Sequence, residues 1–144
     1  MKSILFVCLG NICRSPIAEG IARHLIEQGG HAITVDSAGT GYWHVGEPPC
    51  AHSIRVAHNH GIDISHLRAR QVIKNDFKTF DLIVALDQSN HRDLQDMGCK
   101  NLVKLGDFGH GGADVPDPYF FRGFEGFETV YTMIESCVKE LLNR

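Results

Sequence analysis

The sequence predicts a single α/β domain over residues 1–144, with a four-stranded parallel sheet and helices on both faces. Short apolar runs without polar alternation are typical of strands buried on both faces, and here they alternate with segments of helical spacing. The first two such runs are separated by one helical segment, which favours a right-handed parallel crossover. A chain of 144 residues suits one hydrophobic core.

The first strand, the first helix and the second strand lie in the first 35 residues. Residues 3–8, SILFVC, form the first apolar run and are expected to be a strand. Ser15 followed by Pro16 predicts the start of a helix, with serine as the N-cap and proline at the first helical position. Apolar residues then recur at helical spacing until Gly29 and Gly30 end the helix. Residues 33–35 are expected to form the second strand.

The remaining elements follow the same alternation. Residues 37–49 are polar and rich in glycine and proline, which indicates a loop, and residues 106–123 predict a second, longer one. Asp87 predicts a helix N-cap, while Gly61 and Gly98 mark helix ends. We therefore expect helices at residues 50–60, 87–97 and 124–142, and strands at residues 82–86 and 102–105.

Composition argues against several classes of function. The formal net charge is −3 and the isoelectric point about 6.3, without the stripe of Lys and Arg that nucleic-acid binding requires. The apolar run at residues 4–9 is much shorter than the roughly 20 residues of a membrane span. No C-x2-C pair or H-E-x-x-H helix predicts a metal site. Because no secretory signal is apparent and the five cysteines are an odd number, we expect reduced thiols in the cytoplasm.

Residues 8–15 join the first strand to a helix N-terminus and are the strongest candidate for a functional site. Ligands of parallel sheets bind beyond the carboxyl ends of the strands, and helix N-termini favour anions. Gly10 and Asn11 tolerate a left-handed backbone, so the loop can turn its amides inward. These surroundings favour the thiolate form of Cys8, and the planar fork of Arg14 can hold two phosphate oxygens. The expected phosphate-binding loop comprises Leu9, Gly10, Asn11, Ile12, Cys13, Arg14 and Ser15.

The run C-L-G-N-I-C-R-S-P at residues 8–16 resembles the signature loop of the low-molecular-weight protein tyrosine phosphatases, and the similarity in order and size extends over nearly the whole chain. The resemblance implies a phosphocysteine intermediate on Cys8, phosphate clamping by Arg14 and support of the thiolate by Ser15. It also implies a tyrosine-phosphorylated protein as substrate and partner. We expect a monomer that needs no cofactor and no metal, because Arg14 and the loop amides would stabilise the charge that magnesium stabilises elsewhere.

The same resemblance assigns residues behind and above the loop. Asn11 would hold the strained shape of the loop, with Ser37 and His66 as its partners. The Asp117-Pro118-Tyr119 run matches the segment that carries the general acid of the family. Protonating a tyrosyl leaving group independently requires such an acid. Asp114 is the local alternative, and Asp-Pro is also a common turn without chemistry.

Aromatic side chains are expected to form the substrate cleft. Trp43 aligns with a position that is aromatic in some members of the family, and Tyr119 and Phe120 follow the acid. The alternative for Trp43 is a buried position in the core. A second cysteine of the loop, Cys13, could trap oxidised Cys8 as a reversible disulfide. The other cysteines are interpreted as small buried residues, namely Cys50, Cys99 and Cys137.

Three alternative functions remain open. Arsenate reductases of this fold use two further, closely spaced cysteines, whereas the region after the third strand offers only Cys99. Protein arginine phosphatases carry Thr at the position of Ile12, so Ile12 favours phosphotyrosine. A binding module without catalysis would not need the nucleophile, the arginine and the acid together.

Overall fold

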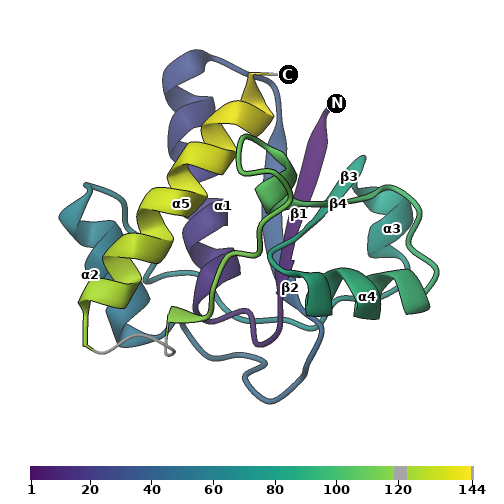
Figure 1. The fold of residues 1–144 in the computed structure, drawn as a ribbon, viewed down its shortest axis with the longest axis horizontal. Coiled ribbons are helices and arrows are strands. Elements are labelled where there is room, and N and C mark those ends of the chain that lie inside the picture. The colour runs from purple at the N-terminus through teal and green to yellow at the C-terminus, as the bar shows by residue number, and fades with distance from the viewer. Residues whose placement is uncertain (119–122, 144) are drawn as a thin grey trace.

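The four strands form one parallel sheet. The protein is described by a computed structural model, which places residues 1–118 and 123–143 (Figure 1). The strands are β1 (Ser3–Cys8), β2 (Thr34–Gly39), β3 (Leu82–Ala85) and β4 (Leu102–Lys104), in the spatial order β2-β1-β3-β4. All three neighbouring pairs are parallel. The predicted four-stranded parallel sheet is confirmed.

Helices cover both faces of the sheet. On one face lie α1 (Arg14–Gly29), α2 (Ala51–Asn59) and α5 (Glu125–Leu142), and on the other lie α3 (Asp76–Thr79) and α4 (Gln88–Asp96) (Figure 1). The side chains of β1 alternate between the two cores, with Ile4 and Phe6 on the α1 side and Leu5 and Val7 on the α4 side. All four are fully buried, as the unbroken apolar run predicts.

The start of α1 differs from the sequence prediction. The helix begins at Arg14, its N-cap residue is Cys13, and no side chain caps its first turn. The Ser15 hydroxyl, predicted to be the cap, instead accepts a hydrogen bond from Asn11 and contacts Cys8. The predicted end of the helix is confirmed, because Gly30 adopts a left-handed conformation directly after Gly29.

Two other local predictions had different outcomes. Asp87 does cap α4, with its Oδ1 accepting from the amide of Asn90 at 2.8 Å. The second strand is longer than predicted and runs to Gly39, because β2 pairs with β1 along its entire length even where its side chains are polar. The single-turn helices α3 and η1 (Leu105–Asp107) were not predicted, and they are too short to give a periodic signal.

The strand order creates a switch point at the carboxyl end of the sheet. The chain leaves β1 toward β2 on one side, whereas β3 lies on the other side of β1. In open α/β sheets a crevice forms where the connections diverge in this way. Cys8 ends β1 and Asp87 follows β3, so both residues lie at this edge of the sheet. Among the described residues, no helix has the length and apolar character needed to cross a membrane.

Candidate functional site

The segment after β1 folds back over the end of the sheet. Asn11 is the one described non-glycine residue with a positive φ, at 58°, which turns the loop sharply. The space beneath the turn depends on Gly39 at the end of β2. A Cβ there would lie 2.7 Å from the Leu9 carbonyl oxygen and 3.1 Å from the Asn11 amide nitrogen. Glycine at position 39 therefore allows the loop to lie directly on β2.

The carbonyl groups of the loop point outward, which determines where its amides point. They accept hydrogen bonds from the segments around them: Thr40 N to Cys8 O at 2.9 Å, Gly41 N to Leu9 O at 2.8 Å and Cys50 N to Ile12 O at 2.8 Å. In a trans peptide the next N–H is directed opposite to the carbonyl, and the described chain has no cis bond. The amides of Leu9, Gly10 and Cys13 therefore face the inside of the loop, as an anion nest requires.

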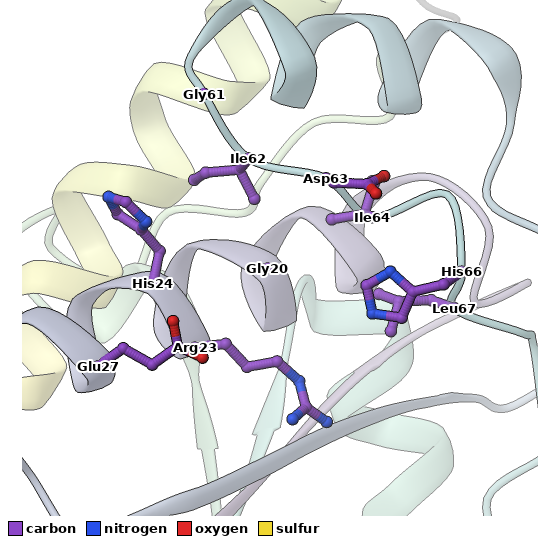
Figure 2. Close-up of a pocket in the computed structure, with 10 residues that line it drawn as sticks. All are labelled: Gly20, Arg23, His24, Glu27, Gly61, Ile62, Asp63, Ile64, His66 and Leu67. Atoms are coloured by element: carbon purple, nitrogen blue, oxygen red, sulfur yellow. The ribbon is translucent and has the colours of Figure 1, made fainter.

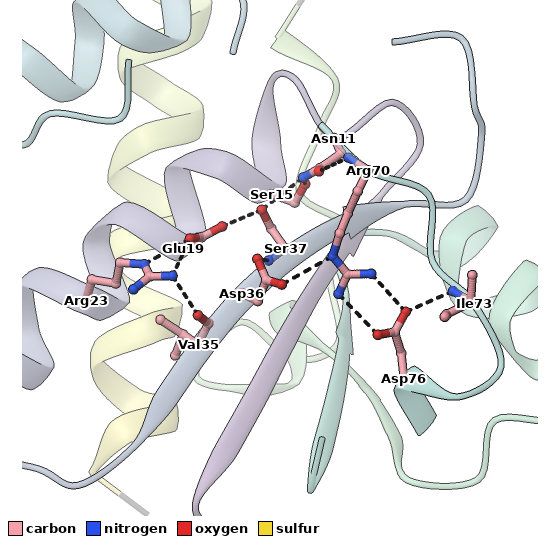
Figure 3. A network of polar contacts seen from close by, with 10 residues as sticks. All are labelled: Asn11, Ser15, Glu19, Arg23, Val35, Asp36, Ser37, Arg70, Ile73 and Asp76. Atoms are coloured by element: carbon pink, nitrogen blue, oxygen red, sulfur yellow. Dashed lines mark hydrogen bonds and ion pairs between the residues drawn. The ribbon is translucent and has the colours of Figure 1, made fainter. Parts of the chain in front are cut away.

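The side chain of Asn11 is held by three partners through its two polar groups (Figure 3). Its Nδ2 donates to Ser15 Oγ at 2.8 Å and to Ser37 Oγ at 2.9 Å. Its Oδ1 accepts from the backbone amide of Arg70 at 3.0 Å. Because an amide group can only donate from nitrogen, the Arg70 contact fixes which way the Asn11 amide points. The predicted contact between Asn11 and Ser37 is present.

Behind Ser37 the network ends on a buried carboxylate (Figure 3). Ser37 Oγ donates to Glu19 Oε1 at 2.6 Å, and Glu19 Oε2 accepts from Arg23. Arg23 also donates to the carbonyl oxygen of Val35. Glu19 is only 2% exposed, and its charge is compensated by this pairing. No motif or spacing in the sequence predicts a place for Glu19 in the site.

Cys8 lies at the base of the loop with its sulfur 2.9 Å from Ser15 Oγ. The Ser15 oxygen already accepts a hydrogen bond from Asn11, so its own hydroxyl proton is available for the Cys8 sulfur. The Ser15 hydroxyl is therefore placed to donate a hydrogen bond to this sulfur. The hydrogen bonds that shape the loop thus also direct a donor at the sulfur atom.

Arg14 is oriented by Asp87 and Val115, which are not part of the Asn11 network. Its Nη1 donates to Asp87 Oδ2 at 2.7 Å and to the Val115 carbonyl oxygen at 2.9 Å. Burial alone would lower the pKa of the Arg14 guanidinium, but the negative charges of Cys8, Asp87 and Asp117 raise it above its ordinary value. Arg14 is therefore a permanent positive charge beside the Cys8 sulfur.

These groups surround a cavity of about 170 Å³. Its lining comprises Cys8, Leu9, Gly10, Ile12, Cys13, Arg14, Trp43, His44 and Asp117. A nucleophilic sulfur at the base, a guanidinium and inward amides on the sides, and a carboxyl group can together bind a tetrahedral oxyanion and exchange one of its substituents. The described residues contain no group of three or more His, Cys, Asp or Glu side chains placed to hold a metal ion.

The family model described as "Low molecular weight phosphotyrosine protein phosphatase" matches residues 3–144. The chain belongs to this family. It is therefore a protein-tyrosine phosphatase by class, and the resemblance stated from residues 8–16 is confirmed.

Relatives of this phosphatase share its full length. It is 41% identical to the low molecular weight phosphotyrosine protein phosphatase of Gallus gallus, covering 100% of this chain and 96% of the relative. The crystal structure of YfkJ from Bacillus subtilis has a TM-score of 0.90 at 42% identity, covering 99% and 93% of the two chains. The structure of a drosophila arginine phosphatase has a TM-score of 0.91 at 34% identity, covering 99% and 96%.

The two candidate acids of the phosphatase lie in different surroundings. Asp117 lines the cavity together with Cys8. Asp114 instead forms an ion pair with Lys104 at 2.7 Å and accepts from the backbone amide of Gln88 at 2.9 Å. The hydrogen-bonded ammonium group of Lys104 lowers the pKa of Asp114, which keeps that carboxyl ionised. The geometry therefore favours Asp117 over Asp114 as the proton donor.

Trp43 is at the mouth of the cavity and not in the core. Its side chain is 61% exposed and stacks on Tyr42, with 5.5 Å between ring centroids. The ring also covers Gly41, where a Cβ would overlap it at 1.9 Å from Cζ3. The other two expected cleft residues, Tyr119 and Phe120, lie outside the described residues.

His66 is not brought to the loop, so its predicted role as a partner of Asn11 is corrected. Ile62 and Ile64 are buried against Gly20 of α1, and this packing leaves His66 exposed. His66 instead lines a separate hollow of about 350 Å³ beside Arg23 (Figure 2). The backbone amide of Arg70 and the carboxylate of Glu19 complete the network that His66 was expected to complete.

The cysteines fall into two groups. Cys99 and Cys137 are buried, as predicted, and burial raises the pKa of both thiols, that of Cys137 to about 11. Cys50, which was interpreted as a small buried residue, is only partly buried. Its sulfur lies 3.2 Å from that of Cys13, in a contact between the loop and the start of α2.

Proposed function

We propose that this chain hydrolyses phosphotyrosine in proteins through a covalent phosphocysteine on Cys8. The observation that carries the proposal is the cavity in which the sulfur of Cys8, the guanidinium of Arg14 and the carboxyl group of Asp117 meet. The phosphoryl group would be bound by the amides of the loop and by Arg14, with its phosphorus above the sulfur. Both sets of donors then stabilise its three equatorial oxygens during transfer.

In the first step the Cys8 thiolate attacks phosphorus. The sulfur–phosphorus bond forms as the bond to the tyrosyl oxygen breaks, and Asp117 protonates that oxygen so that the peptide leaves with a neutral tyrosine. Ser15 stabilises the thiolate before attack through its contact with the sulfur at 2.9 Å.

In the second step water releases the phosphate. Asp117, now ionised, accepts a proton from a water molecule, whose oxygen attacks phosphorus and displaces the Cys8 thiolate. Inorganic phosphate leaves and the enzyme returns to its starting state. Each proton in this scheme passes through Asp117, and no metal ion takes part.

The exposed pair Tyr42 and Trp43 supports an aryl phosphate as the substrate. A phenyl ring held beside Trp43 would extend from the mouth of the cavity to its base, which places the phosphate of phosphotyrosine at Cys8. The shorter side chain of phosphoserine would not combine these two contacts. The protein partner is therefore one that presents phosphotyrosine.

The test is steady-state hydrolysis of phosphotyrosine, phosphoserine and phosphoarginine peptides side by side, in EDTA, with Cys8→Ser as the control. We expect turnover of the phosphotyrosine peptide, its loss in Cys8→Ser, and a phosphorylated Cys8 peptide after rapid acid quenching. Retained turnover in Cys8→Ser would contradict the covalent mechanism.

Phosphoarginine is the second candidate substrate, because one structural neighbour is named as an arginine phosphatase. Ile12 lines the cavity and is the position at which the two specificities are expected to differ. Ile12→Thr should therefore shift the ratio of kcat/KM values toward phosphoarginine. A wild-type preference for phosphoarginine would replace the proposed substrate and leave the role of Cys8 unchanged.

A further inference from the structure

Two thiols outside the phosphate-transfer scheme face each other beside the cavity. The sulfur atoms of Cys13 and Cys50 are 3.2 Å apart, although the residues are 37 positions apart in the sequence. Cys13 belongs to the loop and lines the cavity together with Cys8. Cys50 therefore contacts a thiol that shares the cavity with the nucleophile.

Backbone and side-chain hydrogen bonds hold this pair of thiols together. The amide of Cys50 donates to the Ile12 carbonyl oxygen at 2.8 Å. Ser53 Oγ donates to the Cys13 carbonyl oxygen at 3.2 Å and lies 3.1 Å from the sulfur of Cys50. These bonds hold the backbones of Cys13 and Cys50 beside each other, and Ser53 contacts both the Cys13 carbonyl oxygen and the Cys50 sulfur.

Both cysteines also lie at helix N-termini. Cys13 is the N-cap residue of α1 and Cys50 is the N-cap residue of α2, and neither helix has a side-chain cap. The N-terminus of a helix stabilises a negative charge on a neighbouring cysteine and so promotes its reaction. The sulfurs of these two N-cap cysteines are in contact with each other.

We infer that Cys50 is a resolving thiol that returns the oxidised nucleophile to its active form. The inference rests on the proposed role of Cys8. A peroxide oxidises the Cys8 thiolate to a sulfenic acid and is reduced to water. The Cys13 thiolate attacks the Cys8 sulfur, and hydroxide leaves as water, which gives a Cys8–Cys13 disulfide. The Cys50 thiolate then attacks Cys13, forming a Cys13–Cys50 disulfide and releasing the Cys8 thiolate.

Over these three reaction steps, one molecule of hydrogen peroxide is reduced to two molecules of water, and two thiols are oxidised to one disulfide. The two electrons come from Cys13 and Cys50, so Cys8 ends in the state in which it began. Phosphatase activity therefore returns without an external reductant, and an external dithiol is needed only to reset the Cys13–Cys50 pair for another round.

The experiment treats the full chain with one equivalent of hydrogen peroxide, removes the excess with catalase and follows phosphotyrosine hydrolysis without reductant. Samples are alkylated under denaturing conditions and mapped by mass spectrometry. The wild type should regain activity and yield the Cys13–Cys50 disulfide. Cys50→Ser should lose this recovery, accumulate Cys8–Cys13 and respond only to dithiothreitol. Cys99→Ser, whose sulfur is buried in the other core, should behave like the wild type.

Three results would overturn the inference. The first is recovery in Cys50→Ser at the wild-type rate, and the second is Cys8–Cys13 as the final product in the wild type. Cys8→Ser adds a third arm, in which the Cys13–Cys50 disulfide should form much more slowly because the peroxide-reactive thiolate is missing. Equal rates would mean that the pair reacts with peroxide directly and is no relay. Activity measured before peroxide tests the proposed function separately, so failure of one is distinguishable from failure of the other.

Discussion

The carboxylate of Asp87 orients Arg14 and caps a helix at the same time. Its Oδ2 lies 2.7 Å from Arg14 Nη1, and its Oδ1 accepts the Asn90 amide at 2.8 Å. The side chain that begins α4 thereby positions the guanidinium beside Cys8. The two roles use different oxygens and can be separated by substitution.

Asp87→Asn should retain the cap through its remaining carbonyl oxygen and lose the charge that holds Arg14. We expect kcat/KM for an aryl phosphate to fall by about tenfold to a hundredfold, since a hydrogen bond to a charged group contributes about 1.5–3 kcal/mol. Asp87→Ala should show the same loss of activity and, in addition, a free energy of unfolding lower by about 1 kcal/mol. Steady-state kinetics and urea unfolding of both variants test this. Wild-type kcat/KM in Asp87→Asn would show that Val115 alone orients Arg14.

Asp117→Asn should slow hydrolysis in a way that depends on the leaving group. The loss should reach about 10²–10⁴-fold for a phenyl phosphate with a poor leaving group and be much smaller for p-nitrophenyl phosphate, which needs little protonation. Asp114→Asn is the matched control, because that carboxyl is bound to Lys104. A plot of log kcat/KM, which reports the first step alone, against leaving-group pKa for the three proteins is the measurement. Equal losses of kcat/KM on both substrates in Asp117→Asn would transfer the role of acid to another group.

Ser37→Ala should reduce both stability and activity, although Ser37 does not line the cavity. Removing its hydroxyl leaves one amide proton of Asn11 and one oxygen of Glu19 without their present partner. Buried groups left in this way cost about 1–3 kcal/mol each. Thermal unfolding and the inhibition constant for inorganic phosphate are the two readouts. His66→Ala, outside the network, should change neither, and an effect of His66→Ala equal to that of Ser37→Ala would contradict the corrected placement.

The protein should lose stability in strong alkali as Tyr131 ionises. Burial, with the nearby Glu135 and Glu128, raises the pKa of Tyr131 from 10.0 to about 12. Because the pKa of Tyr131 is higher in the folded state, the neutral phenol stabilises the fold at pH values below 10. That contribution is lost as the pH rises toward 12. The decrease should be up to about 3 kcal/mol. Unfolding by urea at pH 9 to 12 measures it, and Tyr131→Phe should flatten the curve. An equally steep curve in Tyr131→Phe would assign the effect to other groups.

The parts of the site that depend on local rules were predictable from the sequence. Cys8 at the end of an apolar strand, Asn11 at the turn and Arg14 at a helix start are each encoded within a few residues. The cap by Asp87 is equally local and was predicted. Its ion pair with Arg14 was not, because it requires β1 and β3 to be neighbours, and the strand order does not follow from the strands themselves.

Errors arose where packing of distant segments decides the position of a side chain. His66 is directed away from the loop because Ile62 and Ile64 are packed on α1, and only the three-dimensional contact with Gly20 reveals this. The meeting of Cys13 and Cys50 likewise follows from the return of the chain after β2, and no spacing rule connects the two positions. Glu19 stands four positions before Arg23, a spacing that indicates only an ordinary helical ion pair. The bond of its other oxygen to Ser37 depends on how α1 packs on β2.

The partners of Asn11 also determine which part of the molecule must stay folded for the site to exist. One of them, Ser37, belongs to β2, which is an edge strand that pairs with β1 alone apart from a single bridge from Gly39 to Gln71. Edge segments open more readily than a central strand, and such openings expose amides to hydrogen exchange without global unfolding. Detachment of β2 would release the turn at Asn11 while the helices stayed in place. On heating, catalytic competence should therefore disappear before helical circular dichroism does, so the melting temperature overstates the range in which the enzyme works.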